Sequence, residues 1–352
     1  MKNPKEGKMR KSVFRIFWLT GFFGLAINFA HGQVPVPFSQ YYQNPQILNP
    51  AFAGIEDYWS VNLGYRHTPV KGLAAKTYTA GFNGVFPLPA TRGNDPLLNT
   101  IKGSDNDAVV NRQRDMVYRG LRTRHGIGGV LYNQEVDSYS NILGEASYAI
   151  HVPLSFTSML SLGLGSFFFN SKLGIDDWVV RDTEDELYRR LKDEGGKIND
   201  IYIQGGVVWH AQKFYVGYSF SQMIQSTSYS FNDDDLSQTG KHLLTAGYKH
   251  RFSQDWMWLS SVFTHYSKEK DVTFAGATQL DYKEMFRVGA LYSQDEFVTG
   301  MLGFSAKNRL RVDYSYSHPV GGNYSLGSNK GSHELSLSFF FYKKSGVERY
   351  FW

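Results

Sequence analysis

Hydrophobic and polar residues alternate along most of the chain after position 58. The pattern is clear at Trp59, Val61 and Leu63, where every second residue is large and apolar. A period of two residues is typical of a β-strand that buries one face and presents the other to different surroundings. The alternation predicts fourteen strands, in windows 59–65, 78–86, 126–134, 142–150, 160–168, 201–209, 214–220, 241–252, 256–266, 271–282, 286–292, 297–306, 310–316 and 335–341.

The connections between these windows differ in length in an ordered way. Four of them are short and come after even-numbered strands: Ala211-Gln212, Ser253-Gln254, Lys283-Glu284 and Lys307-Asn308. Longer polar connections, 171–200, 221–240 and 319–331, follow odd-numbered strands. Outer-membrane barrels have short periplasmic turns and longer outer loops, whereas a soluble β-sandwich gives no reason for this sorting. With both chain ends on the periplasmic side, the longer connections are expected outside the cell.

One connection breaks this rule. Residues 87–125 follow an even-numbered strand but form a long insertion, expected on the periplasmic side. These residues mix both charges with turn formers and contain no period-two run. The insertion is therefore not expected to form barrel wall. We hypothesise a contact arm for a partner, and a tolerated insertion without a role remains the alternative.

Composition agrees with a barrel rather than with a helical membrane protein. Aromatic residues make up 16% of the chain, there are 35 glycines, and mean hydropathy is −0.36. Lipid-facing and lumen-facing residues alternate in a barrel strand, which keeps average hydropathy low. The sequence therefore predicts an all-β, transmembrane antiparallel β-barrel of about 14 strands, covering residues 59–342, in the outer membrane of a Gram-negative bacterium.

The first 32 residues resemble an export signal. Six basic residues between Lys2 and Arg15 precede the apolar run 16–30, and Ala30-His31-Gly32 fits a signal-peptidase site. A membrane anchor is the alternative, but the run is shorter than the roughly 20 residues that span a bilayer. Removing residues 1–32 takes away six of 37 Lys+Arg and one of 32 Asp+Glu, leaving 31 of each. The mature chain thus lacks the net positive charge that nucleic-acid binding requires, and no nucleic-acid partner is expected.

No catalytic, metal or cofactor site is expected. The chain has no cysteine, and its ten histidines form no HExxH or HxH motif. Ser317-His318 and Ser332-His333 are adjacent on predicted strands, so their side chains should point to opposite faces. The acidic run Asn232–Asp235 is interpreted as a solvated loop tip, with calcium binding as the alternative.

Strand parity, by which we mean that successive side chains of a strand point to opposite faces, also predicts charges inside the barrel. If Leu310, Val312 and Tyr314 face lipid, their alternating neighbours face the lumen. The predicted lumen-facing charges are Lys249, Arg251, Arg287, Arg309, Arg311, Asp313 and Glu334. We expect them to pair with one another and fill the barrel rather than form a selectivity site, because polar interiors are normal in barrels.

The segment before the first strand, 33–58, carries two Asn-Pro pairs, at 44–45 and 49–50, which favour turns. As a periplasmic segment it could simply pack the mouth of the barrel, or it could act as a docking segment or plug. Its run from Phe38 to Gly54 resembles the opening signature of the PorP/SprF family, FSQY…NP…NPAxAG, and Gly331–Glu334 resembles a second family motif. The residues that carry the resemblance, interpreted as docking residues, are Phe38, Ser39, Gln40, Tyr41, Asn44, Pro45, Asn49, Pro50, Ala51, Gly54, Gly331, Ser332, His333 and Glu334.

The resemblance covers about 38–342 and implies an outer-membrane component of the type IX secretion and gliding machinery. Such a component would serve an exported cargo adhesin through its C-terminal sorting domain, and would contact periplasmic ring lipoproteins. The long insertion and the C-terminal extension 343–352 depart from the family pattern. We therefore expect a non-enzymatic protein that supports export or surface attachment of cargo. A passive porin or hydrophobic-solute channel is the alternative, followed by an outer-membrane hydrolase.

Overall fold

The computed structural model describes most of the chain between Ser39 and Phe341. The residues described are 39–56, 58–70, 73–87, 123–137, 139–155, 157–174, 189, 197–224, 240–267, 270–294, 297–306, 309–320 and 331–341. The predicted signal peptide 1–32, Phe38, the acidic run 232–235 and the extension 343–352 lie outside them, as does most of the 87–125 insertion. Among the described residues, no helix has the length and apolar character needed to cross a membrane.

The described residues form three short 3-10 helices and then fourteen strands. The helices are η1 (Tyr41–Gln43), η2 (Pro45–Ile47) and η3 (Pro50–Phe52). The strands are β1 (Trp59–Val70), β2 (Leu73–Pro87), β3 (Arg124–Val136), β4 (Tyr139–Pro153), β5 (Ser158–Leu173), β6 (Lys197–Ala211), β7 (Phe214–Ile224), β8 (Lys241–Arg251), β9 (Trp256–Ser267), β10 (Lys270–Tyr282), β11 (Phe286–Ser293), β12 (Phe297–Ala306), β13 (Leu310–Pro319) and β14 (Ser332–Phe341).

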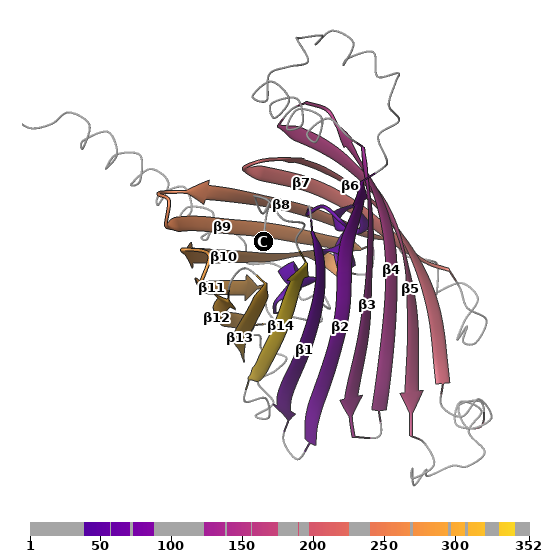
Figure 1. Ribbon diagram of the computed structural model, residues 1–352. Coiled ribbons are helices and arrows are strands. Elements are labelled where there is room, and N and C mark those ends of the chain that lie inside the picture. The colour runs from indigo at the N-terminus through magenta and orange to yellow at the C-terminus, as the bar shows by residue number, and fades with distance from the viewer. Residues whose placement is uncertain are drawn as a thin grey trace, which may run out of the picture.

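These strands close into one antiparallel barrel in which each strand pairs with its neighbours in sequence (Figure 1). The seam is formed by β1 and β14, which pair from Trp59 opposite Phe341 to His67 opposite His333. Closure removes the unpaired strand edges that a membrane would not tolerate. The predicted barrel is confirmed, and each of the fourteen predicted windows corresponds to one strand.

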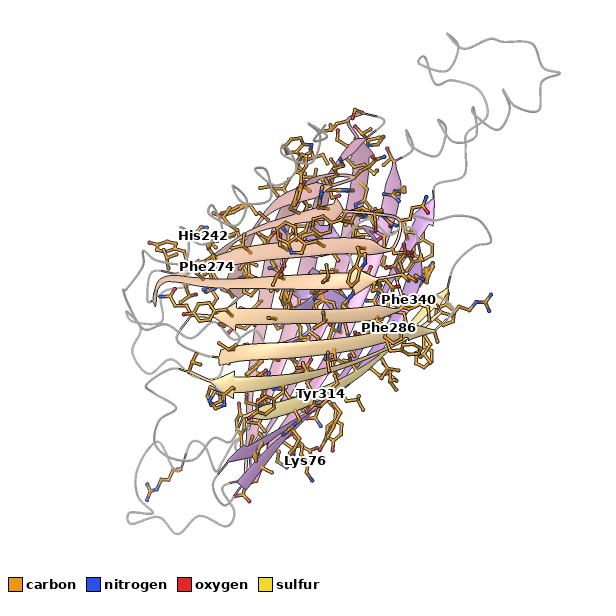
Figure 2. The ribbon with its side chains drawn as sticks, turned by 90° about the vertical axis from the view of Figure 1, so that its left-hand side faces the viewer. Lys76, His242, Phe274, Phe286, Tyr314 and Phe340 are labelled. Atoms are coloured by element: carbon orange, nitrogen blue, oxygen red, sulfur yellow. The ribbon has the colours of Figure 1, made fainter. Side chains whose placement is uncertain are left out.

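The wall is apolar outside and polar inside. On β14, Leu335 and Phe339 are 47% and 38% exposed, whereas Ser336 and Ser338 between them are almost fully buried. Figure 2 labels two of the outward aromatic rings, Phe286 on β11 and Tyr314 on β13. Because the side-chain period of a strand is two, this alternation sets one face of each strand toward lipid.

The two ends of the barrel carry different connections. We call the end with the turns β6–β7, β8–β9, β10–β11 and β12–β13 the turn end, and the opposite end the loop end. The four short turns predicted from the sequence all lie at the turn end. The loop end holds the longer connections between β5 and β6, β7 and β8, and β13 and β14, but it also holds four short ones. Loop length therefore does not separate the two ends completely. At the loop end, only two or three residues connect β1 to β2, β3 to β4, β9 to β10 and β11 to β12, and the longest connection, 88–123 between β2 and β3, lies at the turn end.

Candidate functional site: a segment inside the barrel

Residues 39–56, the described part of the N-terminal segment, lie within the ring of strands (Figure 1). We call these residues the plug. The plug begins at Ser39, which contacts β13 and β14 near their loop ends. It ends near the turn end, where Tyr58, just before β1, packs edge-on against Phe340 with ring centroids 5.5 Å apart. The predicted periplasmic segment therefore runs through the lumen over its described part, as a plug would.

Local sequence explains the irregular path of the plug. Each Asn-Pro pair places proline at the first position of a 3-10 helix, where its missing N–H and fixed φ are tolerated. The Asn49 side chain accepts a hydrogen bond from the backbone N–H of Ala51 at 3.0 Å and caps η3. Gly54 has φ +65°, a left-handed conformation that glycine adopts without strain. The result is a compact series of turns instead of a fifteenth strand.

Asn49 and Leu48 fasten the middle of the plug to the wall. The amide of Asn49 donates to the carbonyl oxygens of Val207 on β6 and Tyr218 on β7, at 3.2 and 3.1 Å. The Leu48 carbonyl accepts from Gln204 Nε2 at 2.8 Å and from Ser219 Oγ at 2.7 Å. Asn49 is completely buried, so these bonds replace those that its amide would make with water.

Glycines in the wall provide space for the plug. A Cβ atom at Gly206 on β6 would overlap the side chain of Asn49, and one at Gly163 on β5 would overlap the backbone at Ala51. Gly126 on β3 is close to the backbone of Ala53 in the same way. Any larger residue at these three positions would push the plug away from the strands.

The two sequence motifs meet at the start of the plug. The backbone N–H of Ser39 donates to Glu334 Oε2 at 3.1 Å, and the Ser39 hydroxyl lies 2.7 Å from that of Ser317. Arg66 on β1 donates to Ser332 Oγ from Nη2 at 2.8 Å. Ser39, Ser332 and Glu334 are buried, whereas His333 is exposed on the outer face. Most motif residues are therefore buried inside the barrel and are inaccessible to a partner while the plug is in place.

Aromatic packing holds η1. Tyr41 meets Phe263 of β9 edge-on at 5.1 Å, and its hydroxyl pairs with Ser261 at 2.5 Å. Burial raises the pKa of Tyr41 to about 12, because the phenolate would lose its hydration. The pKa of neighbouring Tyr42 is raised further by the same desolvation. Both phenols are neutral and act as packing groups at physiological pH.

The predicted lumen-facing charges fall into two groups. Arg287, Arg311, Asp313 and Glu334 are buried inside the barrel. Arg287 forms an ion pair with Asp281 at 3.1 Å and lies 5.7 Å from the ring of Tyr42. Asp313 accepts from Gln43 Nε2 of the plug at 3.1 Å, while Arg311 lies over the Phe340 ring. Asp313 and Glu334 thus contact the plug, Arg287 contacts both Asp281 and the plug, and Arg311 contacts Phe340 of β14.

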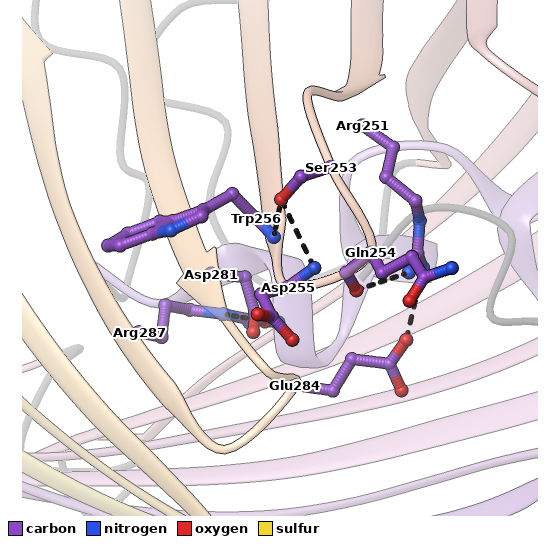
Figure 3. Close-up of polar contacts among 8 residues, drawn as sticks. All are labelled: Arg251, Ser253, Gln254, Asp255, Trp256, Asp281, Glu284 and Arg287. Carbon is purple, nitrogen blue, oxygen red and sulfur yellow. Dashed lines mark hydrogen bonds and ion pairs between the residues drawn. The ribbon is translucent and has the colours of Figure 1, made fainter.

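The other predicted charges lie nearer the turn end. Arg251 is exposed and pairs with Glu284 of the β10–β11 turn at 3.0 Å (Figure 3). Lys249 is half-buried beside a cavity of about 20 Å³ that Tyr41 and Leu259 also line. Arg309 is exposed in the turn before β13, where its N–H bonds to the Ala306 carbonyl. Strand parity does not apply at Arg309, because β13 begins only at Leu310.

Two buried contacts were not predicted from the sequence. His151 on β4 donates from Nε2 to the carbonyl of Ala53 at 2.9 Å, and its Nδ1 lies 2.7 Å from the Ser161 hydroxyl. Asp281 is the ion-pair partner of Arg287. Both lie at inward positions of alternating strands, and parity applied to every polar residue would have found them.

The two Ser-His pairs do not assemble a nucleophile and a base. Ser317 and Ser332 are buried toward the lumen, and His318 and His333 are exposed. His333 Nδ1 instead bonds to the hydroxyl of Tyr314 at 2.7 Å. Within the described part of the chain, no three His, Asp or Glu side chains are grouped as metal ligands.

Comparison with known proteins gives one family. A family model described as type IX secretion system membrane protein PorP/SprF matches residues 30–339. No curated protein matches the sequence.

The comparison with solved structures gives matches of low sequence identity. The CymD monoaromatic hydrocarbon channel is 12% identical, with a TM-score of 0.46, over 86% of this chain and 94% of that chain. The outer membrane protein Omp33 of Acinetobacter baumannii is 9% identical, with a TM-score of 0.44, over 82% and 100%. The Pseudomonas putida toluene transporter TodX is 10% identical, with a TM-score of 0.44, over 86% and 93%. Similarity at this level does not bear on function.

Proposed function

Because the chain belongs to the PorP/SprF family of type IX secretion system membrane proteins, we propose that it supports export or surface attachment of a cargo adhesin, without catalysing a reaction. The family places it as an outer-membrane component of type IX secretion. We further propose that this component is a closed scaffold and that its partners bind to the rims and loops of the barrel.

The plug is the observation that carries the proposal. Its backbone and side chains are bonded to β6, β7, β13 and β14, and residues such as Asn49 and Ala51 are fully buried. A passive channel needs a continuous path for solute through its lumen. A segment fixed across the lumen by buried hydrogen bonds favours a scaffold over such a channel.

The buried motif also changes where partners are expected. Ser39, Asn49 and Glu334 cannot contact another protein while the plug is seated. We therefore assign to the motif the role of closing and stiffening the barrel. An exported cargo with a C-terminal sorting domain would then bind at a rim or a loop. Periplasmic ring lipoproteins would bind at the turn end, which carries exposed charged groups such as the Arg251–Glu284 pair (Figure 3).

Co-purification from native membranes tests the partner proposal. A strain lacking the gene is complemented with tagged wild-type protein or with a variant carrying Arg251→Ala and Glu284→Ala. We expect wild-type protein to retain the adhesin and the ring lipoproteins, and the variant to lose part of the lipoproteins while folding normally. Normal adhesin display in the strain that lacks the protein would contradict the proposal.

Planar-bilayer recording tests the channel alternative. We expect wild-type protein to give no steady conductance, and a variant lacking residues 39–56 to give one if its barrel closes. Steady conductance of the wild-type protein with selectivity for small solutes would favour a passive channel instead.

A further inference from the structure

Basic side chains gather at the turn end of the barrel. Among the described residues of the turns and strand ends there, the exposed or half-buried acidic ones are Asp255 and Glu284. The basic ones outnumber them by five to two and occupy all four hairpins from β6 to β13: Lys213, Lys249, Arg251, Lys283 and Arg309. We call these five residues the basic arc. Its surplus of positive charge favours an anionic partner.

Backbone hydrogen bonds join neighbouring hairpins of the basic arc. The N–H of Lys249 donates to the carbonyl of Lys213 at 2.7 Å. The N–H of Lys283 donates to the carbonyl of Asp255 at the same distance. The main chain that carries these charges is therefore fixed by the wall, and a partner would bind without first having to order it.

The turn between β10 and β11 departs from the usual residue choice for its conformation. Lys283 and Glu284 have φ +53° and +55°, and the Met285 N–H donates to the Tyr282 carbonyl at 3.0 Å. A turn with two left-handed central residues favours Asn-Gly or Asp-Gly. Glu284 meets Arg251 of the next hairpin (Figure 3), but an exposed ion pair contributes little to stability. Strained residues cluster at binding and catalytic sites, and this strained turn places Lys283 on the rim.

Two members of the basic arc lie on the lumen side of the wall. In the β8–β9 register, Lys249 is paired with Leu259. Arg251 is paired with Met257 in the same register. Leu259 and Met257 are buried toward the lumen, and residues paired in register point to the same face. The next residue, Phe252, is an aromatic ring that is 58% exposed on the outer face. Lys249 and Arg251 thus face the barrel mouth, which disfavours a lipid head group as their ligand.

The spacing of the hairpins indicates a ligand with several anionic groups. Successive hairpins repeat every two strands, or about 10 Å at about 4.8 Å between strands. Lys213, Lys283 and Arg309 lie on three different hairpins, so one carboxylate cannot contact them all. An extended polypeptide advances about 10 Å in three residues. Acidic side chains at every third position of such a chain match this repeat.

From the sign, face and spacing of these charges, we propose that the basic arc binds an acidic segment of a partner polypeptide. Carboxylates of that segment accept hydrogen bonds from Lys213, Lys283 and Arg309, because ammonium and guanidinium groups are donors that suit carboxylates. Among the described residues, none of these three side chains forms an ion pair. The identity of the partner rests on the proposed function, in which ring lipoproteins bind at the turn end, but the chemistry of binding does not.

Asp255 lies among the hairpins of the basic arc and opposes the binding of an acidic segment. Its N–H donates to Ser253 Oγ at 3.2 Å, and its carbonyl accepts from the Lys283 N–H. Both bonds use the backbone, so Asp255→Asn keeps them and removes one negative charge. This variant should therefore bind the acidic segment more tightly than wild type does.

Fluorescence anisotropy with the purified protein in uncharged detergent tests the proposal. The probe is a labelled twelve-residue peptide with Glu at every third position and Ser elsewhere, and its control peptide has Gln in place of Glu. The test variant carries Lys213→Gln and Lys283→Gln. The matched control carries Lys76→Gln and Lys172→Gln, two exposed lysines near the loop end. Heat-modifiable gel mobility verifies that each variant is folded.

We expect the Glu peptide to bind, the Gln peptide not to bind, and added salt to weaken binding. Affinity should fall about twofold to fivefold for each lysine replaced in the test variant, the range typical of exposed ion pairs. The control variant should stay within twofold of wild type. Equal affinities of the test and control variants would overturn the proposal.

A second measurement separates a polypeptide from a lipid as the ligand. The same variants are compared for retention of phosphatidylglycerol during purification. Retention that falls in the test variant, without binding of the Glu peptide to wild type, would assign the surface to lipid and overturn the proposal. Because the assay contains no type IX component, its failure would leave the co-purification test of the proposed function unaffected.

Discussion

The backbone N–H of Ser39 donates to the carboxylate of Glu334 at 3.1 Å, across 295 positions of the chain. This bond joins the first described residue of the plug to the last strand of the barrel. Both residues are buried, so neither can exchange the bond for one with water.

Replacing Glu334 with Gln should loosen the start of the plug. A buried bond to a charged acceptor contributes about 1.5–3 kcal/mol, whereas an exposed ion pair contributes at most about 1 kcal/mol. We expect Glu334→Gln to lower the temperature at which the barrel loses its heat-modifiable gel mobility. The control is Glu284→Gln, which breaks the exposed pair with Arg251. Equal shifts in the two variants would contradict the role of Glu334.

Adjacent glycines on β6 allow a matched test of the space for the plug. A Cβ at Gly206 would overlap Asn49, whereas a Cβ at Gly205 would meet nothing within 4 Å. Gly206→Ala should destabilise the protein by about 1–3 kcal/mol, as overpacking does, and should expose the plug to protease. Gly205→Ala should leave both properties unchanged. The plug placement would be wrong if the two variants behaved alike.

A disulfide can report directly on plug position, because the chain has no native cysteine. The hydroxyl oxygens of Ser39 and Ser317 are 2.7 Å apart, so cysteine sulfur atoms at these positions would have to approach by only a few tenths of an ångström to reach the disulfide bond length of about 2.0 Å. The double variant Ser39→Cys, Ser317→Cys should oxidise readily and migrate differently on non-reducing gels. Each single variant should give a thiol that labels only slowly. Fast labelling of both thiols in the double variant would show that the plug lies elsewhere.

Alkaline pH should weaken the packing of η1. The folded-state pKa of Tyr41, about 12, lies above its ordinary value near 10. The stabilisation linked to this proton is therefore complete below pH 10 and is lost as pH rises through 12. Tyr41→Phe cannot ionise, so the unfolding temperature of this variant should fall less between pH 9 and 12 than that of wild type. If the unfolding temperatures of wild type and Tyr41→Phe fell equally between pH 9 and 12, the Tyr41 phenol would be accessible to water.

Much of the wall could be predicted from the sequence, because each strand repeats a two-residue pattern set by lipid on one side. Strand bounds were less accurate. β2 begins at Leu73, before the predicted 78, and β5 extends to Leu173, beyond the predicted 168. Near the barrel rims the surroundings become polar on both faces, so the alternation weakens where strands end.

The plug could not be traced in the same way. Asn49 is placed by carbonyl groups on β6 and β7, far away in sequence, and no local pattern encodes those contacts. Asn-Pro pairs predict turns but do not predict where the turns dock. The inward glycines of the wall, such as Gly163 and Gly206, were the available signal, since an alternating strand has little other use for a missing side chain at an inward position.

The course of the plug constrains how the protein can assemble. Residues 39–56 lie inside a ring that is completed only when β14 pairs with β1, and they lead directly into β1. If the seam closed first, the segment would have to thread through an already sealed cylinder. Folding of the plug against the inner surface of the sheet while the cylinder is still open avoids that passage. We therefore expect barrel closure and plug seating to be coupled, and any later release of the segment to proceed along the barrel axis.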